Sequence, residues 1–208
     1  MEAWTPGGGL LVSQPAQGRV VLLTPGPGGT GTPRTLLSGL TSPQGLAFAR
    51  VAGQRVLYVA ESDQIDRYRW NAGRVSGTPA VIAGRLPDLD PAGDDVHREK
   101  DVAVAPDGTV YFNVGSSSNA SPGDRTSAPP RATIEAVPPG GGIPRVVETG
   151  VRNGEGLAVV PAGTVGRRST TATTSPIPST GPTAASRTPS GGSSRPTSTS
   201  TRPTRSSR

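Results

Sequence analysis

A short phrase occurs three times along the chain at nearly constant spacing, and this repeat restricts the possible folds more than any other feature. The phrases are QGLAF at residues 44–48, KDVAV at 100–104 and EGLAV at 155–159. Their matching residues Leu46, Val102 and Leu157 lie 56 and then 55 residues apart. The first two phrases lead through a turn into a second apolar run, VLYVAES and TVYFNVGS. This spacing predicts one structural unit repeated along the chain.

Each unit has the pattern of short β-strands. In the middle unit Val102 and Val104 alternate with small residues, a PDG turn follows at residues 106–108, and apolar alternation resumes at 110–114. No stretch has helical periodicity. The repeat predicts an all-β fold, an incomplete β-propeller of about three to four blades, with a β-sandwich as the alternative. Further strands are expected at residues 10–13, 19–23, 44–48, 56–60, 64–70, 81–86, 132–137 and 145–148, and a fourth unit begins at 156–165.

The chain consists of two parts of different composition. Residues 1–165 contain 14 Lys and Arg, all 15 Asp and Glu, and every aromatic residue. Residues 166–208 contain seven Arg and no acidic residue, and they are rich in Ser, Thr and Pro. Such a segment cannot bury enough apolar surface to become ordered. We therefore expect a partial β-propeller over residues 1–165 and a disordered tail over 166–208.

A shift of the reading frame would explain the composition of the tail. In a shifted frame, the codons of residues 166–179 permit Trp-Ala-Ala-Val-Asn-Asn-Arg-Asp-Asn-Ile-Pro-Tyr-Pro-Phe. This sequence would continue the fourth unit into the strand that it lacks. The hypothesis is that the chain is a truncated, frameshifted version of a longer propeller. The seven arginines would then be accidental, so we expect no nucleic-acid partner.

Several classes of protein are not indicated by this sequence. Without cysteine there is no disulfide framework and no thiolate metal site. No apolar run approaches the roughly 20 residues of a membrane helix, so we expect no membrane partner. The first residues lack a signal-peptide pattern, so we expect a cytoplasmic location for the chain as written. The Gly-rich residues 25–33 lack the Lys-Ser/Thr of a phosphate-binding loop and are expected to connect two strands.

The chain resembles the glucose/sorbosone dehydrogenase family, soluble quinoprotein six-bladed β-propellers that use pyrroloquinoline quinone. The similar phrases are LLVSQPAQGRVVLL, GLTSPQGLAF with LYVAES, DVAVAPDGTVYFNVGSSSN preceded by the single histidine, and TGVRNGEGLAV. They extend over most of residues 10–165, and GVRNGEGLAV is the most specific of them. The resemblance implies a six-bladed type of which this chain contains a part.

The resemblance also implies roles for individual residues. His97 would be the catalytic general base on a sugar hydroxyl, with hydride transfer to the quinone. Arg152 and Asn153 would bind the carbonyl and carboxylate oxygens of the cofactor, and Gln44 would lie nearby. An imidazole can accept an alcohol proton near neutral pH, and a guanidinium suits an anionic ligand with several carboxylates.

Two departures from the family pattern affect this expectation. Gly154 and Glu155 replace the usual Pro-Gln after Asn153, which places an acid beside the expected anion site. The blades that would complete the quinone and calcium sites are missing. Pyrroloquinoline quinone and calcium are therefore expected by resemblance only and not as ligands of this fragment, which we expect to be inactive. Members of the family are often secreted or periplasmic, and the substrate would be a small sugar.

Other interpretations of these residues remain open. His97 could be a solvated loop residue, and Arg152 could pair with Glu155 or Glu148 on the surface. The acidic loop with Asp88, Asp90, Asp94 and Asp95 lacks the spacing of a known calcium motif and is expected to be solvated.

Two other functions also suit the sequence. One is a metal-dependent lactonase of the gluconolactonase/regucalcin type, which Asn153 and Glu155 beside GLAV resemble. The other is a non-catalytic binding propeller, for which a His97→Ala substitution would cause no loss of function.

Overall fold

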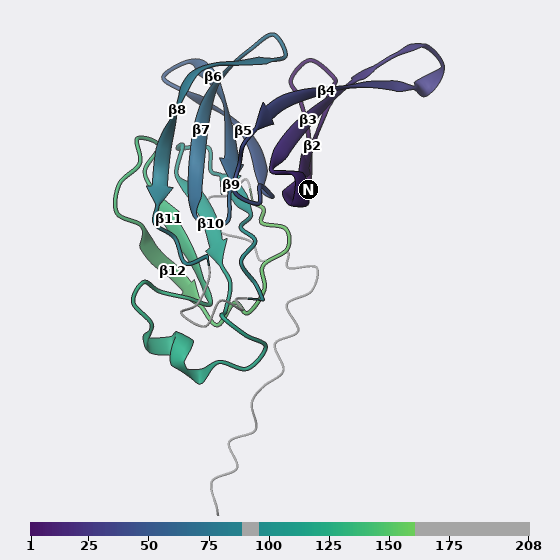
Figure 1. The fold of residues 1–208 in the computed structure, drawn as a ribbon. Helices are drawn as coiled ribbons and strands as arrows, with labels where there is room; N and C mark the ends of the chain where they lie inside the picture. The colour runs from purple at the N-terminus through teal and green to yellow at the C-terminus, as the bar shows by residue number, and fades with distance from the viewer. Residues whose placement is uncertain (89–95, 161–208) are drawn as a thin grey trace, which may run out of the picture. The chain divides into compact units, whose positions relative to one another are not determined.

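The structure is a computed structural model that describes residues 1–88 and 96–160 (Figure 1). These residues form 12 strands in three four-stranded antiparallel sheets. The helices in this described part are three single 3₁₀ turns, and none is long and apolar enough to cross a membrane. The turns are η1 (Pro15–Gln17), η2 (Pro27–Gly29) and η3 (Pro122–Thr126).

Each sheet is a meander in which consecutive strands are hydrogen-bonded neighbours (Figure 1). The first sheet contains β1 (Glu2–Trp4), β2 (Leu10–Gln14), β3 (Arg19–Pro25) and β4 (Gly31–Ser38). The second contains β5 (Leu46–Val51), β6 (Gln54–Ala60), β7 (Gln64–Asn71) and β8 (Arg74–Gly84). The third contains β9 (Val102–Val104), β10 (Val110–Val114), β11 (Thr133–Val137) and β12 (Arg145–Thr149).

Two apolar clusters join neighbouring sheets through their faces. The first cluster lies between the first and second sheets and the other lies between the second and third, so the second sheet packs against both of its neighbours. Burial of such side chains is the main stabilising contribution, at about 25 cal/mol for each Å² of apolar surface. The first cluster is centred on Leu11, Val20, Leu57 and Val59, and the second on Tyr58, Ile65, Phe112 and Val114.

The first strands of the three sheets lie next to one another, since β5 contacts both β1 and β9. Gly45, just before β5, makes the closest approach: a Cβ there would lie 2.7 Å from the backbone nitrogen of Val102 and 2.8 Å from Cα of Asp101. Its N–H also donates to the Lys100 oxygen at 3.0 Å. Repeated four-stranded sheets with neighbouring first strands are the arrangement of a β-propeller. The predicted partial propeller is confirmed, and the β-sandwich alternative is wrong.

Most predicted strands are present, with three differences. β1 and β4 were not predicted, and β8 begins at Arg74 rather than at Val81. β4 and the first half of β8 are mostly exposed, so burial does not impose alternation on their sequences. The Gly-rich residues 25–33 connect β3 to β4 as expected, although β4 already begins at Gly31.

The fourth unit differs from its predicted form. Residues 151–160 form no strand, although the phrase at 155–159 matches the beginnings of β5 and β9. A strand needs a hydrogen-bonded neighbour in its own sheet, and the following residues, from 161 onward, lie outside the described part of the chain. The expected boundary at residue 165, the tail over 166–208 and its frameshift origin also lie outside the described residues.

Candidate functional site

His97 is the most enclosed of the four residues proposed from the sequence. It lies in the segment before β9 with 8% of its surface exposed. Its Nδ1 is 3.1 Å from the backbone oxygen of Ser116 and 3.1 Å from the Ser116 hydroxyl. The interpretation of His97 as a solvated loop residue is therefore wrong.

The contacts of Ser116 determine which nitrogen of the imidazole carries the proton. A carbonyl oxygen can only accept, so the bond to the Ser116 backbone oxygen requires Nδ1–H as donor. The Ser116 hydroxyl has its own acceptors, the backbone oxygens of Ser118 at 2.7 Å and Arg152 at 3.2 Å. In the neutral ring, Nε2 then carries the lone pair and is the basic atom.

Gly115 allows this close approach between the histidine and the end of β10. A Cβ at Gly115 would lie 2.6 Å from Cβ of His97 and in contact with its backbone oxygen. Any other residue would push the His97 segment away from Ser116. The glycine at the end of TVYFNVG is thus a packing requirement of the site.

A fully buried lysine holds the segment that carries His97. The Lys100 ammonium is 0% exposed and donates to the backbone oxygens of Pro87 and Arg98, each at 2.7 Å. The segment is also bonded to β10 and its continuation: the Val96 N–H donates to the Ser117 oxygen at 3.3 Å. Residues 96–101 are therefore fixed at several points.

Arg152 meets the histidine through Ser116. The Ser116 N–H donates to the Arg152 backbone oxygen at 2.8 Å, so one serine contacts both predicted site residues. The Arg152 side chain is exposed, and its Nη1 donates to Oδ1 of Asn119 at 3.1 Å. Within the described residues no ion pair joins Arg152 to Glu155 or Glu148, so the expected surface pairing is wrong.

The two predicted amide residues are placed less closely. Asn153 follows Arg152, but its Nδ2 donates to Oε1 of Glu155 at 3.0 Å. Gln44 is half-buried before β5, where its backbone oxygen accepts from the Ser13 hydroxyl at 2.8 Å. Its link to the histidine segment runs through the neighbouring Gly45, which donates to Lys100. The structure thus connects His97 to Arg152 through Ser116. Gln44 and Asn153 are connected to this pair only through neighbouring residues.

Two supporting residues, Asp101 and Asn113, were not identified from the sequence. Asn113 Oδ1 accepts the Asp101 N–H at 2.5 Å, and its Nδ2 donates to the Glu99 oxygen at 3.3 Å. Asp101 accepts the N–H of Val102 at 3.0 Å and that of Leu157 at 2.8 Å. Burial raises the pKa of Asp101, while its backbone hydrogen bonds lower it. These contacts connect residues 150–160 to the third sheet.

The donors of this site suit an anionic, oxygen-rich ligand. A guanidinium and a carboxamide lie on one segment, whose main chain contacts the same Ser116 as the buried imidazole. Glu155 is the one residue of that segment that opposes an anion. Among the described residues no group of three or more His, Asp or Glu is arranged to hold a metal ion. Of the acidic loop considered for calcium, Asp88 pairs with Arg98 at 3.8 Å, and its other acids lie outside the described part.

Solved structures with a similar fold are sugar dehydrogenases. The pyranose dehydrogenase PQQ domain of Coprinopsis cinerea matches with a TM-score of 0.59 and 19% identity, over 78% of this chain and 41% of that chain. An oxidoreductase (glucose dehydrogenase) of Thermus thermophilus matches with a TM-score of 0.58 and 23% identity, over 77% and 54%. The PQQ-bound aldose sugar dehydrogenase of Streptomyces coelicolor matches with a TM-score of 0.56 and 22% identity, over 78% and 53%.

These matches establish the fold of the described part. The chain spans between two fifths and just over half of the length of these three proteins. No protein-family model matches the chain, and no curated protein matches it.

Proposed function

We propose that this chain carries part of the active site of a quinone-dependent sugar dehydrogenase. The observation that supports the proposal best is the Ser116 contact, which orients the His97 ring and leaves Nε2 as its basic atom. The fold similarity to proteins named as PQQ-dependent sugar dehydrogenases supports it independently. In this proposal His97 removes the proton from a sugar hydroxyl through Nε2.

Arg152, Asn153 and Gln44 are the residues that would hold pyrroloquinoline quinone. When bound, the quinone supplies a two-electron acceptor for the hydride of the substrate carbon. Arg152 contributes a fixed positive charge for a carboxylate, and the two amides contribute hydrogen bonds to oxygen atoms. The Ser116 bridge keeps the Arg152 main chain in register with the imidazole, so the base and the anion-binding group are positioned together.

Quinone titration of a complete propeller that contains this segment tests the binding part of this proposal. We expect Arg152→Gln to weaken quinone binding about tenfold, the size of one charge-assisted contact. Arg74→Gln is the matched control, because Arg74 is also exposed but lies on β8. Equal affinity of the two variants would contradict the assignment.

Dye reduction with aldoses tests the catalytic part. We expect little or no turnover from the 208-residue chain, because its described residues supply three four-stranded sheets, and quinone-dependent turnover from a protein in which further sheets close the propeller. In the complete protein, His97→Ala should lower kcat by about 10²–10⁴-fold, the usual contribution of a general base. Unchanged turnover would contradict the role of His97, and absence of turnover from the complete parent protein would favour the non-catalytic binding propeller.

A further inference from the structure

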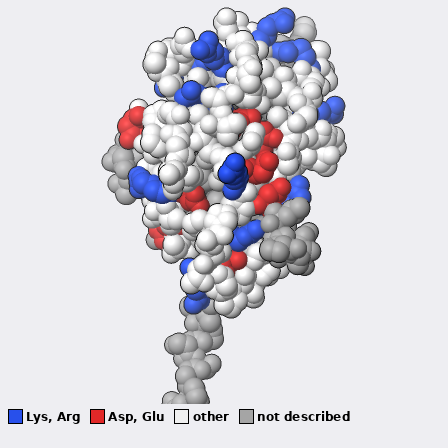
Figure 2. Space-filling model, turned by 60° about the vertical axis from the view of Figure 1, so that its left-hand side comes forward, with Lys and Arg blue, Asp and Glu red and all other residues white. Residues whose placement is uncertain are grey.

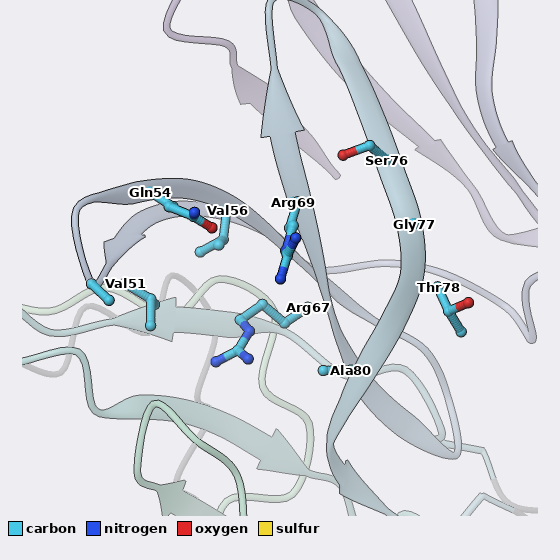
Figure 3. A pocket seen from close by; sticks show the side chains of 10 residues that line it. Val51, Gln54, Val56, Arg67, Arg69, Ser76, Gly77, Thr78 and Ala80 are labelled. Carbon is cyan, nitrogen blue, oxygen red and sulfur yellow. The ribbon is translucent and has the colours of Figure 1, made fainter.

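A polar pocket lies on the second sheet, apart from the candidate site. The pocket has a volume of 510 Å³, and none of the four candidate site residues lines it (Figure 3). Its polar lining comes from three strands: Gln54 of β6, Arg67 and Arg69 of β7, and Ser76 and Thr78 of β8. These residues offer hydrogen-bond donors of several kinds around one space.

The two arginines point to the same side of β7. Because side chains alternate along a strand, residues two apart share a face. Figure 3 shows the Arg67 and Arg69 side chains extending into the space beside Gln54. Two guanidinium groups thus line one hollow and would both reach a ligand there.

An irregularity in the sheet opens the pocket on the β8 side. The pairing between β7 and β8 changes from Arg67 opposite Ala80 to Arg69 opposite Ser76. Three residues of β8, at positions 77–79, therefore lie opposite Tyr68 alone. A bulge of this kind bends its strand away from its neighbour. Ser76 and Thr78 both line the pocket, and Figure 3 shows the Ser76 hydroxyl on the side of the arginines and the Thr78 side chain pointing away from them.

No acidic residue lines the pocket. Within residues 1–88 and 96–160, no carboxylate forms an ion pair with either arginine. Arg67 donates one Nη1 hydrogen bond to the Pro139 oxygen, which fixes its guanidinium. Figure 2 shows one face of the molecule, on which acidic and basic side chains lie close to one another. The pocket is therefore a local site of uncompensated positive charge.

We propose that this pocket binds the phosphate group of a small ligand. Two guanidinium groups match the charge and the oxygen geometry of a phosphate dianion, and hydroxyl and amide donors complete its hydrogen bonds. The volume exceeds that of phosphate alone, so a phosphomonoester such as a hexose phosphate also fits. Inorganic phosphate and a phosphomonoester share the recognised chemistry, and competition between them identifies the source.

Calorimetric titration of the whole chain at low ionic strength tests the site with inorganic phosphate, a hexose phosphate and the free hexose. Two charge-assisted contacts of ordinary strength correspond to a dissociation constant of about 1 mM. We expect saturable binding of both phosphates, none of the free hexose, and about tenfold weaker binding by Arg69→Gln. Arg69 is exposed, so this variant should keep the melting temperature of the parent chain.

Arg55→Gln is the matched control. Arg55 lies on β6 between the lining residues Gln54 and Val56 but does not line the pocket. Arg55→Gln and Arg69→Gln each lower the net charge by one, so a difference between them reflects the pocket alone. Unchanged binding by Arg55→Gln supports a defined site, and tighter binding of the hexose phosphate than of phosphate identifies a phosphomonoester. Equal weakening by both variants, or the absence of saturation, would overturn the proposal.

Discussion

His97 and Ser116 are joined by a 3.1 Å hydrogen bond from the ring Nδ1 to the backbone oxygen, so the main chain at the end of β10 determines the ring orientation. A main-chain acceptor is present whatever side chain occupies position 116. The orientation of the imidazole is therefore encoded by the fold of the third sheet rather than by another side chain.

The first prediction concerns the histidine tautomer. We expect the neutral His97 ring to carry its proton on Nδ1, since only that form donates to the Ser116 oxygen. The chain contains one histidine, so ¹⁵N NMR of the imidazole is free of overlap. Ser116→Ala retains the backbone acceptor and should keep this tautomer. A dominant Nε2–H form would contradict the described geometry.

The second prediction concerns Gly115. Gly115→Ala should destabilise the protein by about 2–3 kcal/mol, because the new methyl group would overlap with His97. Gly123→Ala is the control, since a Cβ at Gly123 meets nothing within 4 Å, and its effect should stay within about 0.5 kcal/mol. Urea unfolding of both variants measures the difference. Equal stability would show that the His97 segment does not pack against Gly115.

The third prediction concerns Asp101, which accepts the N–H groups of Val102 and Leu157. Asp101→Ala leaves both donors without their partner and should cost about 1–3 kcal/mol. Hydrogen exchange at the Leu157 amide should accelerate more than exchange in β6, because the Leu157 N–H donates its hydrogen bond to the Asp101 carboxylate. Uniform acceleration in both places would indicate general destabilisation instead.

The fourth prediction concerns pH and the acidic pair Glu61 and Asp66. Burial is the main cause that raises the pKa of Glu61 to about 7, and the charge of the neighbouring Asp66, whose own pKa is raised by burial, adds to the increase. Two buried carboxylates that lie close together repel each other, so the folded state favours a proton on this pair. The Thr41 N–H also donates to Glu61 and opposes the increase.

The folded protein therefore binds this proton more tightly than the unfolded chain, in which a glutamate has a pKa of about 4.3. Stability is greatest below that value and falls as the pH rises through 7, by roughly 3–4 kcal/mol in total. Thermal unfolding at pH 5 and pH 8 measures the decrease. Glu61→Gln keeps a donor towards Asp66 and should remove most of the pH dependence. A wild-type protein that is more stable at pH 8 would contradict the prediction.

The strands that were predicted from the sequence are those with buried side chains. In β6, residues 56–60 are all buried, and in β10 only Tyr111 is partly exposed, so both have the apolar pattern that marks a core strand. β1 has three residues, and β4 is exposed over most of its length. The pairing of these edge strands with a neighbour determines their structure, and a single sequence does not show such pairing.

The candidate site was predicted in part. His97 and Arg152 came from the family resemblance, and the structure joins them through Ser116. Ser116 and Asp101 were missed, because their contacts connect residues far apart in sequence and both residue types are common in loops. The one local signal was the Ser-rich stretch directly after β10. Glycine at position 115 could have indicated a close approach of another chain segment.

The buried Lys100 ammonium binds the oxygens of Pro87 and Arg98, which lie on either side of residues 89–95. One buried ammonium thus holds the main chain at Pro87 and at Arg98. The peptide between the two anchor points can then be exchanged or lengthened at little cost, since closing a longer loop costs only about 0.6 kcal/mol per doubling of its length. A change of chain length between Pro87 and Arg98 should accordingly leave the His97 imidazole in position.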